Sequence, residues 1–232
     1  MVRPRKIGDF KSTIGHVAQT SHYQVFFDGL STSLFSHLAS KGVDRRFISE
    51  RAGLLCNSAS IPGSTLGTSD IFGNFTGVQE KFAHTRIFTE IVLDFYVDAD
   101  YKMIKFLEHW IEYISSGSEI GGSSKVNKSS PAYFYRMRYP RGDSGYKCDS
   151  VRIVKFDRDY DNEIEYSFIG MFPISLSSTP VQYGSSDTLR VNCTFNYERY
   201  IAGKSNSASG LRGVSENNLP KSWAGASRFF GN

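Results

Sequence analysis

The sequence predicts a mainly β protein, and two features carry that prediction. Apolar and polar residues alternate along Ile87–Val97 and again along Leu189–Tyr197, and a period of two is typical of strands with one buried face. The chain is also rich in phenylalanine and tyrosine, with 18 and 13 residues, and both residues favour strands. We therefore expect two packed antiparallel sheets or a β-barrel, with one flanking helix and extended terminal arms.

The first part of the chain predicts an arm, a strand, a short helix and a loop. Residues 1–20 are polar and basic, which indicates an N-terminal arm. Tyr23–Leu30 predicts a strand that ends at an Asp-Gly turn. Apolar residues at helical spacing within 31–42, between a Ser or Thr cap and a glycine, predict a short helix. The Gly-, Pro- and Ser-rich stretch Ser58–Asp70 predicts a loop.

One strong helix follows the first alternating strand, at about residues 99–116. Its apolar residues recur every three or four positions, with Lys and Glu largely on the opposite side. We expect Asp98 or Asp100 to cap its start and Gly117 to end it. Four strand-like segments come after a flexible loop, namely Ala132–Tyr139, Val151–Phe156, Ile164–Met171 and Leu189–Tyr197. No internal repeat is found, so we expect one β domain over residues 21–202 and a C-terminal arm over 203–232.

Composition and charge argue against several functional classes. The net charge of +4, from 27 basic and 23 acidic residues, is too mild to indicate nucleic-acid binding. The three cysteines, Cys56, Cys148 and Cys193, are far apart in sequence, so they form no C-x-x-C pair and are expected to be reduced. No apolar run of about 18 residues and no signal-peptide pattern is found. We expect a soluble chain that is made in the cytoplasm and has no membrane partner.

The sequence singles out no catalytic, cofactor-binding or metal-binding residues. The five histidines are scattered and form neither H-x-x-x-H nor H-E-x-x-H. Neither G-x-S-x-G nor a phosphate-binding glycine loop is present, and no convincing Cys-His pairing is found. Many carboxylates are available for acid–base chemistry, but no pattern selects two of them. We therefore expect no enzyme activity, no cofactor and no metal.

Three segments, taken in their order along the chain, carry a family resemblance. They are the Pro-Gly loop IPGSTLGTSD, the strand and helix FTEIVLDFYVDADYKMIKFLEHWIEYI, and the later stretch YSFIGMFPISLSSTPVQYGSSDTLRVNCTFNYERY. This order resembles that of the tail tube proteins of contractile-tailed phages of the T-even type. The resemblance covers residues 54–202. No single motif is diagnostic of the family, and the order of the three segments distinguishes it from other families.

The resemblance implies a structural virion protein whose two packed sheets close into a small barrel with a helix on its flank. In that family six copies form a ring, and stacked rings form the conduit for DNA ejection inside a contractile sheath. The implied partners are further copies of the chain, the tail sheath protein, the hub and wedge proteins of the baseplate, the tape measure protein and passing DNA. The implied location is the virion tail, after synthesis in the cytoplasm of the bacterial host.

Two groups of residues are candidates for contacts between subunits. Proline has no backbone N–H to donate to the hydrogen bonds of a sheet. Pro173 therefore predicts that the chain crosses from one sheet to another there, which leaves strand edges that a neighbouring subunit can pair with. Trp223, Phe229 and Phe230 stand alone in the Gly- and Ser-rich arm. Isolated aromatic residues in such an arm are typical of anchors that dock on a neighbouring subunit, and a frayed tail is the alternative.

The polar face of the last strand is a candidate for the lining of the tube. Arg190, Asn192, Thr194 and Asn196 share this face, and polar residues line the interior of large barrels. Exposure to the outer solvent is an equal alternative. If the face lines a lumen, we expect Lys and Arg to avoid a continuous stripe along it, because many phosphate contacts would retain DNA.

Other functions stay open on the sequence alone. The same fold would serve in a baseplate tube-initiator protein that joins the hub and wedges to the tail tube, or in the tube of a phage-derived secretion system. A nucleic-acid-binding β-barrel would use the basic, aromatic stretch Tyr133–Arg141. An unrecognised enzyme would show a cluster of perturbed pKa values in a deep pocket.

Overall fold

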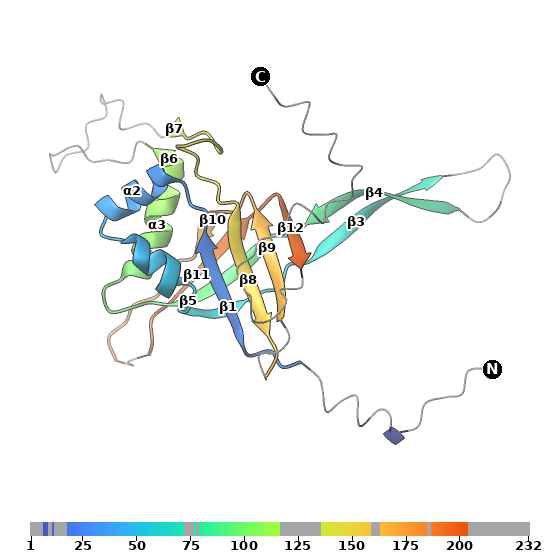
Figure 1. Cartoon of the computed structure of the whole chain (residues 1–232), viewed down its shortest axis with the longest axis horizontal. Helices are drawn as coiled ribbons and strands as arrows, with labels where there is room; N and C mark the ends of the chain where they lie inside the picture. The colour runs from blue at the N-terminus through green and yellow to red at the C-terminus, as the bar shows by residue number, and fades with distance from the viewer. Residues whose placement is uncertain are drawn as a thin grey trace.

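The computed structural model describes residues 7, 8, 11, 18–71, 77, 79–116, 136–158, 163–184 and 187–203. In this part of the chain most strands belong to two antiparallel sheets, and the helices within residues 32–114 lie together on one flank (Figure 1). None of the helices described there is both long enough and apolar enough to cross a membrane. The two predicted arms fall largely outside the described residues.

The two larger sheets have four strands each. Sheet A has the order β1-β8-β9-β12, formed by Tyr23–Asp28, Ser150–Phe156, Glu163–Ile169 and Arg199–Gly203. Sheet B has the order β10-β11-β5-β2, formed by Phe172–Leu176, Arg190–Asn196, Ile91–Tyr96 and Cys56–Ala59. The prediction of two packed antiparallel sheets is confirmed. The closed barrel implied by the family resemblance is wrong for the single chain, because the described strands remain in two separate sheets.

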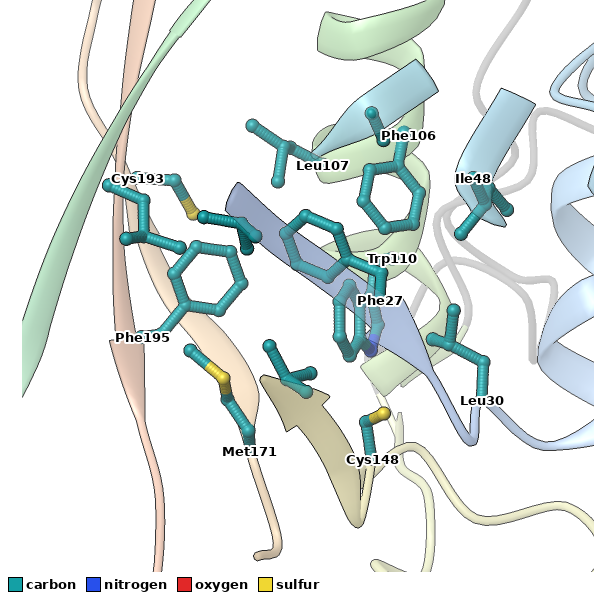
Figure 2. Packing of buried hydrophobic residues seen from close by; sticks show 14 of the residues in the cluster. Phe27, Leu30, Ile48, Phe106, Leu107, Trp110, Cys148, Met171, Cys193 and Phe195 are labelled. Atoms are coloured by element: carbon teal, nitrogen blue, oxygen red, sulfur yellow. The ribbon is translucent and has the colours of Figure 1, made fainter. Parts of the chain in front are cut away.

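An apolar layer joins the two sheets. The ring centroid of Phe27, in sheet A, lies 6.1 Å from that of Phe95 and 6.3 Å from that of Phe195, both in sheet B. The same ring lies 5.4 Å from Phe106 of the main helix, and Figure 2 shows Phe27, Phe195 and Trp110 gathered in this layer. All of these side chains are buried. Because burying a side chain of this size contributes about 1.5–3 kcal/mol, the layer determines how the sheets face each other.

The flank carries three helical segments. They are α2 (Thr32–Ser40), the short π-helix η1 (Phe47–Ala52) and α3 (Lys102–Ile114). The predicted short helix is confirmed as α2, in which the Ser31 hydroxyl accepts a hydrogen bond from the backbone N–H of Leu34 at 3.2 Å. Gly42, just past its end, has a φ of +87°, a conformation that glycine adopts without strain. The sequence pattern did not predict η1.

Helix α3 lies inside the range predicted for it. Of the two candidate caps, Asp98 is the one that acts, since its carboxylate accepts from the backbone N–H of Met103 at 3.0 Å. The indole N–H of Trp110 donates to the carbonyl of Tyr146 at 3.0 Å, and the hydroxyl of Tyr113 donates to that of Ser144 at 2.9 Å. These bonds tie the loop before β8 to the buried face of α3.

Several other predictions are confirmed or corrected by the strands. The predicted strands at Tyr23–Leu30, Val151–Phe156, Ile164–Met171 and Leu189–Tyr197 are confirmed as β1, β8, β9 and β11. The single long strand at Ile87–Val97 is wrong, because β4 ends at Phe88 and β5 begins at Ile91. The loop at Ser58–Asp70 is also wrong, because most of it forms β3 (Ser64–Ile71), which pairs with β4 (Glu80–Phe88). The described part of Ala132–Tyr139 holds the short strand β7 (Arg136–Met137), paired with β6 (Ser115–Ser116).

The chain does cross between the sheets near Pro173, but it crosses before this residue. Gly170 has a φ of +68° and Met171 forms an isolated bridge with Cys148, so the turn lies between β9 and β10. Pro173 lies inside β10, an edge strand of sheet B, next to an irregularity in the pairing with β11. Edges and bulges are the places where a sheet tolerates proline. The glycine makes the turn because a positive φ is costly for other residues.

A charged network holds this turn in place. The backbone N–H of Gly170 donates to the carboxylate of Asp149 at 2.8 Å, and Arg141 joins Asp149 to Glu198 at 3.3 and 2.6 Å. Lys147 also binds Glu198, at 2.8 Å. Hydrogen bonds from Lys147 and then Arg141 lower the pKa of Glu198 despite its partial burial. The turn between the sheets is therefore fixed by both backbone geometry and charge.

Replacement of Gly170 by alanine is expected to destabilise the protein by about 1–3 kcal/mol. Its φ is +68°, and an added Cβ would lie 2.8 Å from the carboxyl carbon of Glu198. Gly142→Ala is the matched control, because Gly142 has a φ of +94° and open space around it, so only the backbone cost of about 1–2 kcal/mol applies. Urea unfolding measures both variants. If both substitutions lowered the free energy of unfolding equally, the result would contradict a constraint from the Glu198 network.

Candidate assembly surface

The β3–β4 hairpin extends away from both sheets, at the opposite end of the molecule from the helices (Figure 1). Its strands, Ser64–Ile71 and Glu80–Phe88, have eight and nine residues, and nearly all of these are exposed. A two-stranded ribbon without a covered face is marginally stable in water. The hairpin is therefore the first candidate for a surface that another molecule covers.

One face of the hairpin carries a stripe of large apolar side chains. The pairs Thr65–Ile87, Ser69–Phe82 and Ile71–Glu80 lie on this face, as their register shows. Ile71, Phe82 and Ile87 are 53%, 47% and 53% exposed, and we call these three residues the apolar stripe. The opposite face is more polar towards its tip, where Lys81 pairs with Asp70 at 3.8 Å, although it also carries the exposed Leu66.

A β-bulge brings the stripe together. Gly67 pairs with Thr85 and the next residue, Thr68, pairs with Ala83, so His84 is the extra residue of the bulge. Phe82 and Ile87 are an odd number of residues apart, which in a regular strand puts them on opposite faces. The bulge moves Phe82 onto the face of Ile87. The sequence pattern missed the stripe for this reason, and the apolar spacing alone could not have revealed it.

The other open edges differ in how well they are protected. Sheet A ends at β1 and β12, and the end of η1 packs on the backbone of β1, where a Cβ on Gly53 would overlap the carbonyl of Val25. Sheet B ends at β10 and β2. The side chain of Pro173 is buried, and the residue pairs with Phe195 in β11. Its contact with a neighbouring subunit stays a prediction, while its place on an edge strand is observed.

The polar face of β11 has the predicted alternation. Val191, Cys193 and Phe195 are buried in the apolar layer. On the other face Arg190 is exposed, and the remaining candidates Asn192, Thr194 and Asn196 are half-buried. The guanidinium of Arg190 lies 5.2 Å from the ring centroid of Tyr96 on the neighbouring strand. The four candidates therefore share one surface of sheet B, and whether this surface meets a lumen or the outer solvent stays open at this point.

The two sheets differ in charge. Among the four strands of sheet B, the charged residues are Arg190 and Asp94, and Asn57 donates to the Asp94 carboxylate at 3.0 Å. The strands of sheet A carry more charges of both signs, namely Asp28, Arg152, Lys155, Glu163, Glu165 and Arg199. In the described strands of sheet B, no continuous row of Lys and Arg is present. The polar face of sheet B is thus a weakly charged, hydrogen-bonding surface.

The described residues offer few groups for chemistry. No group of three His, Cys, Asp or Glu side chains in this part of the chain is arranged to hold a metal ion. Burial raises the pKa of the thiols of Cys148 and Cys193 to about 12, so they are protonated at neutral pH and are weak nucleophiles. On α3, His109 interacts with Glu112. The absence of enzyme activity stays a prediction.

The basic, aromatic stretch proposed for nucleic acids is described from residue 136 onwards. The guanidinium of Arg138 lies 4.2 Å from the ring centroid of Tyr113, and Arg141 pairs with Asp149 and Glu198. Both arginines are therefore engaged within the chain. Trp223, Phe229 and Phe230, the predicted anchors of the C-terminal arm, lie outside the described residues.

Comparisons with known proteins give a family match for the sequence and similar folds among solved structures. A family model described as phage tail tube protein matches residues 18–203, and no curated protein matches the sequence. Among solved structures, a chain from an extracellular contractile injection system, the PVC sheath-tube complex in its extended state, is similar with a TM-score of 0.50 and 14% identity, over 84% of this chain and 97% of that one. At this identity the likeness concerns the fold alone.

Two other solved structures show weaker similarity. One is from the PVC sheath/tube terminator in its extended state, with a TM-score of 0.49 and 15% identity over 81% of this chain and 96% of that one. The other is the crystal structure of Hcp protein, with a TM-score of 0.38 and 7% identity over 80% and 99% of the two chains. Likenesses at this level add no argument about function.

Proposed function

Since the chain belongs to the phage tail tube protein family, we propose that six copies of it form a ring and that stacked rings form the tube of a contractile tail. The exposed apolar stripe of the β3–β4 hairpin is the observation that carries this proposal. A tube is built from many copies of one chain, so a second copy is the partner that is always present to cover the stripe.

The stripe gives each subunit a physical reason to associate. Full burial of a large apolar side chain contributes about 1.5–3 kcal/mol. Ile71, Phe82 and Ile87 are each about half exposed, so covering them contributes about 1 kcal/mol per residue. A contact between different surfaces of identical subunits closes into a ring when the rotation between neighbours permits it. The hairpin would then lie on the next subunit around the ring.

We propose that the polar face of β11 lines the conduit through which DNA leaves the particle. The weak charge of sheet B supports this orientation. A lumen rich in Lys and Arg would bind the phosphate backbone at many points and slow its passage, whereas Asn192, Thr194 and Asn196 offer neutral polar groups. The mechanism is passive, because the subunit supplies a rigid, wetted wall and no catalytic group.

The remaining partners follow from this position in the tail. The tube would contact the sheath protein on its outer surface, the hub and wedge proteins at the baseplate, and the tape measure protein and DNA in its lumen. The chain would be made in the cytoplasm of the bacterial host and would function in the virion tail. A baseplate tube-initiator role and the tube of a phage-derived secretion system require the same fold, and no observation favours either of them.

Copy number distinguishes these roles. In purified particles, quantitative mass spectrometry against the major capsid protein is expected to find enough copies for dozens of rings. A copy number sufficient for only one or two rings would support the tube-initiator role instead, because an initiator is needed only at the lower end of the tube. Absence of the chain from the particle would contradict a structural role in the virion.

Replacement of Phe82 by serine is expected to raise the protein concentration required for ring or tube formation about fivefold, because a loss of about 1 kcal/mol per contact lowers the association constant by about that factor. Leu66→Ser is the matched control, since Leu66 is an exposed apolar residue on the opposite face of the same hairpin. Sedimentation velocity and negative-stain microscopy of both purified variants make the measurement. Normal assembly of Phe82→Ser, with or without loss of assembly in Leu66→Ser, would contradict a contact through the apolar stripe.

A further inference from the structure

We propose that Arg86 is a positioning residue that fixes the direction in which the hairpin leaves the body of the protein. The inference rests on the proposed function, because the direction of the hairpin matters where the apolar stripe must reach a second copy. Arg86 acts together with Ser64 and Tyr200, and we call these three residues the clamp. The clamp lies at the base of the hairpin, on the face opposite the stripe.

The clamp joins both strands of the hairpin to an edge strand of sheet A. The guanidinium of Arg86, in β4, donates to the hydroxyl of Ser64, in β3, from Nε at 3.2 Å and from Nη2 at 3.1 Å. Nη2 also donates to the hydroxyl of Tyr200, in β12, at 3.1 Å. The two hydroxyl oxygens are themselves 3.2 Å apart. One planar group therefore connects three strands.

Aromatic rings enclose the same guanidinium. Its central carbon lies 5.0 Å from the ring centroid of Phe88 and 5.2 Å from that of Tyr200. The two rings lie 5.4 Å apart, nearly perpendicular to each other. Arginine at this distance from aromatic faces is held by cation–π attraction. The hydrogen bonds and the rings together restrict Arg86 from several directions.

Tyr200 is a firm anchor because its ring is packed against the core. Its centroid lies 6.0 Å from that of Tyr166 and 6.3 Å from that of Tyr197. The ring of Tyr197 lies in turn 4.9 Å from Phe168, which is fully buried. Tyr200 therefore connects the base of the hairpin, through Tyr197 and Phe168, to the apolar layer between the sheets.

The length of the hairpin makes a small change at its base important. At about 3.4 Å per residue, the eight residues of β3 span about 27 Å. A swing of about 10° at the base would then move the tip by about 5 Å, which exceeds the separation at which apolar atoms are in contact, about 4–4.5 Å. Within the described residues, the side-chain hydrogen bonds found between the hairpin strands and the sheets converge on the clamp. Loss of Arg86 would leave the stripe free to move out of register with its partner.

Lysine is a poor replacement at this position. It keeps the positive charge but lacks the planar fork that binds two oxygens while it stacks on a ring. Arg86→Lys therefore separates the effect of charge from the effect of geometry. Lys81→Ala is the matched control, because it removes a cation from the same face of the same hairpin, far from the base, where Lys81 pairs with Asp70.

The direct test measures the direction of the hairpin in the unassembled, full-length protein. Spin labels are attached at Thr68→Cys in β3 and Ser36→Cys in α2, both exposed positions. The native thiols of Cys148 and Cys193 are buried, so they compete little for the label, and the half-buried Cys56 is replaced by serine in every labelled variant. Pulsed electron paramagnetic resonance then gives the distribution of distances between the two labels. We expect a narrow distribution in the parent and in Lys81→Ala, and a broad one in Arg86→Ala and Arg86→Lys.

Assembly provides the second measurement. Arg86→Ala is expected to need at least about tenfold more protein for ring formation, with the folded body intact by circular dichroism. A narrow distribution or parent-like assembly in Arg86→Ala would overturn the positioning role. Failure of the parent itself to assemble would overturn the proposed function instead, and the distance distributions would still decide whether Arg86 fixes the hairpin.

Discussion

The apolar layer between sheets A and B is the constraint on which the rest of the structure depends. Phe27, Phe95 and Phe195 bring the two sheets together, and Trp110 and Phe106 bring α3 against the same layer. Each sheet has one face buried there, and the other face carries polar and charged residues with a few apolar ones, such as Val92 in sheet B and Ile201 in sheet A. At the base of the β3–β4 hairpin Phe88 packs against the edge of the core, but the described hairpin residues beyond the base are nearly all exposed. Ile71, Phe82 and Ile87 are therefore exposed in a single copy, and assembly with a second copy is the cover that we propose for them.

Strands with one buried face could be predicted from the sequence. Successive side chains of a strand point to opposite faces, so burial of one face produces an alternation of apolar and polar residues. Leu189–Tyr197 is the clearest case, since its alternate residues enter the apolar layer. The alternation along Ile87–Val97 is equally regular, yet the chain turns away from sheet B between Phe88 and Ile91. The period of two says that a segment is extended and does not say which sheet it joins. Only tertiary contacts decide that point.

The candidate site was harder to predict. Ser64–Ile71 has the Gly- and Ser-rich composition of a loop, and its exposed faces in the single chain leave no alternation to detect. The stripe depends on the bulge at His84, which no composition or spacing rule places in advance. Pro173 correctly indicated a change of sheet, but the turn is made by Gly170, whose positive φ is visible only in the structure. The polar face of β11 was found because it is the complement of a buried face.

Cryo-electron microscopy of the assembled full-length protein tests the central claim most directly. The account predicts stacked six-membered rings in which the face of each hairpin that carries Ile71, Phe82 and Ile87 lies against the next subunit. It also predicts that the polar face of sheet B, with Asn192 and Thr194, borders the central channel. Rings in which the hairpins project freely into solvent while sheet B faces outwards would contradict the account.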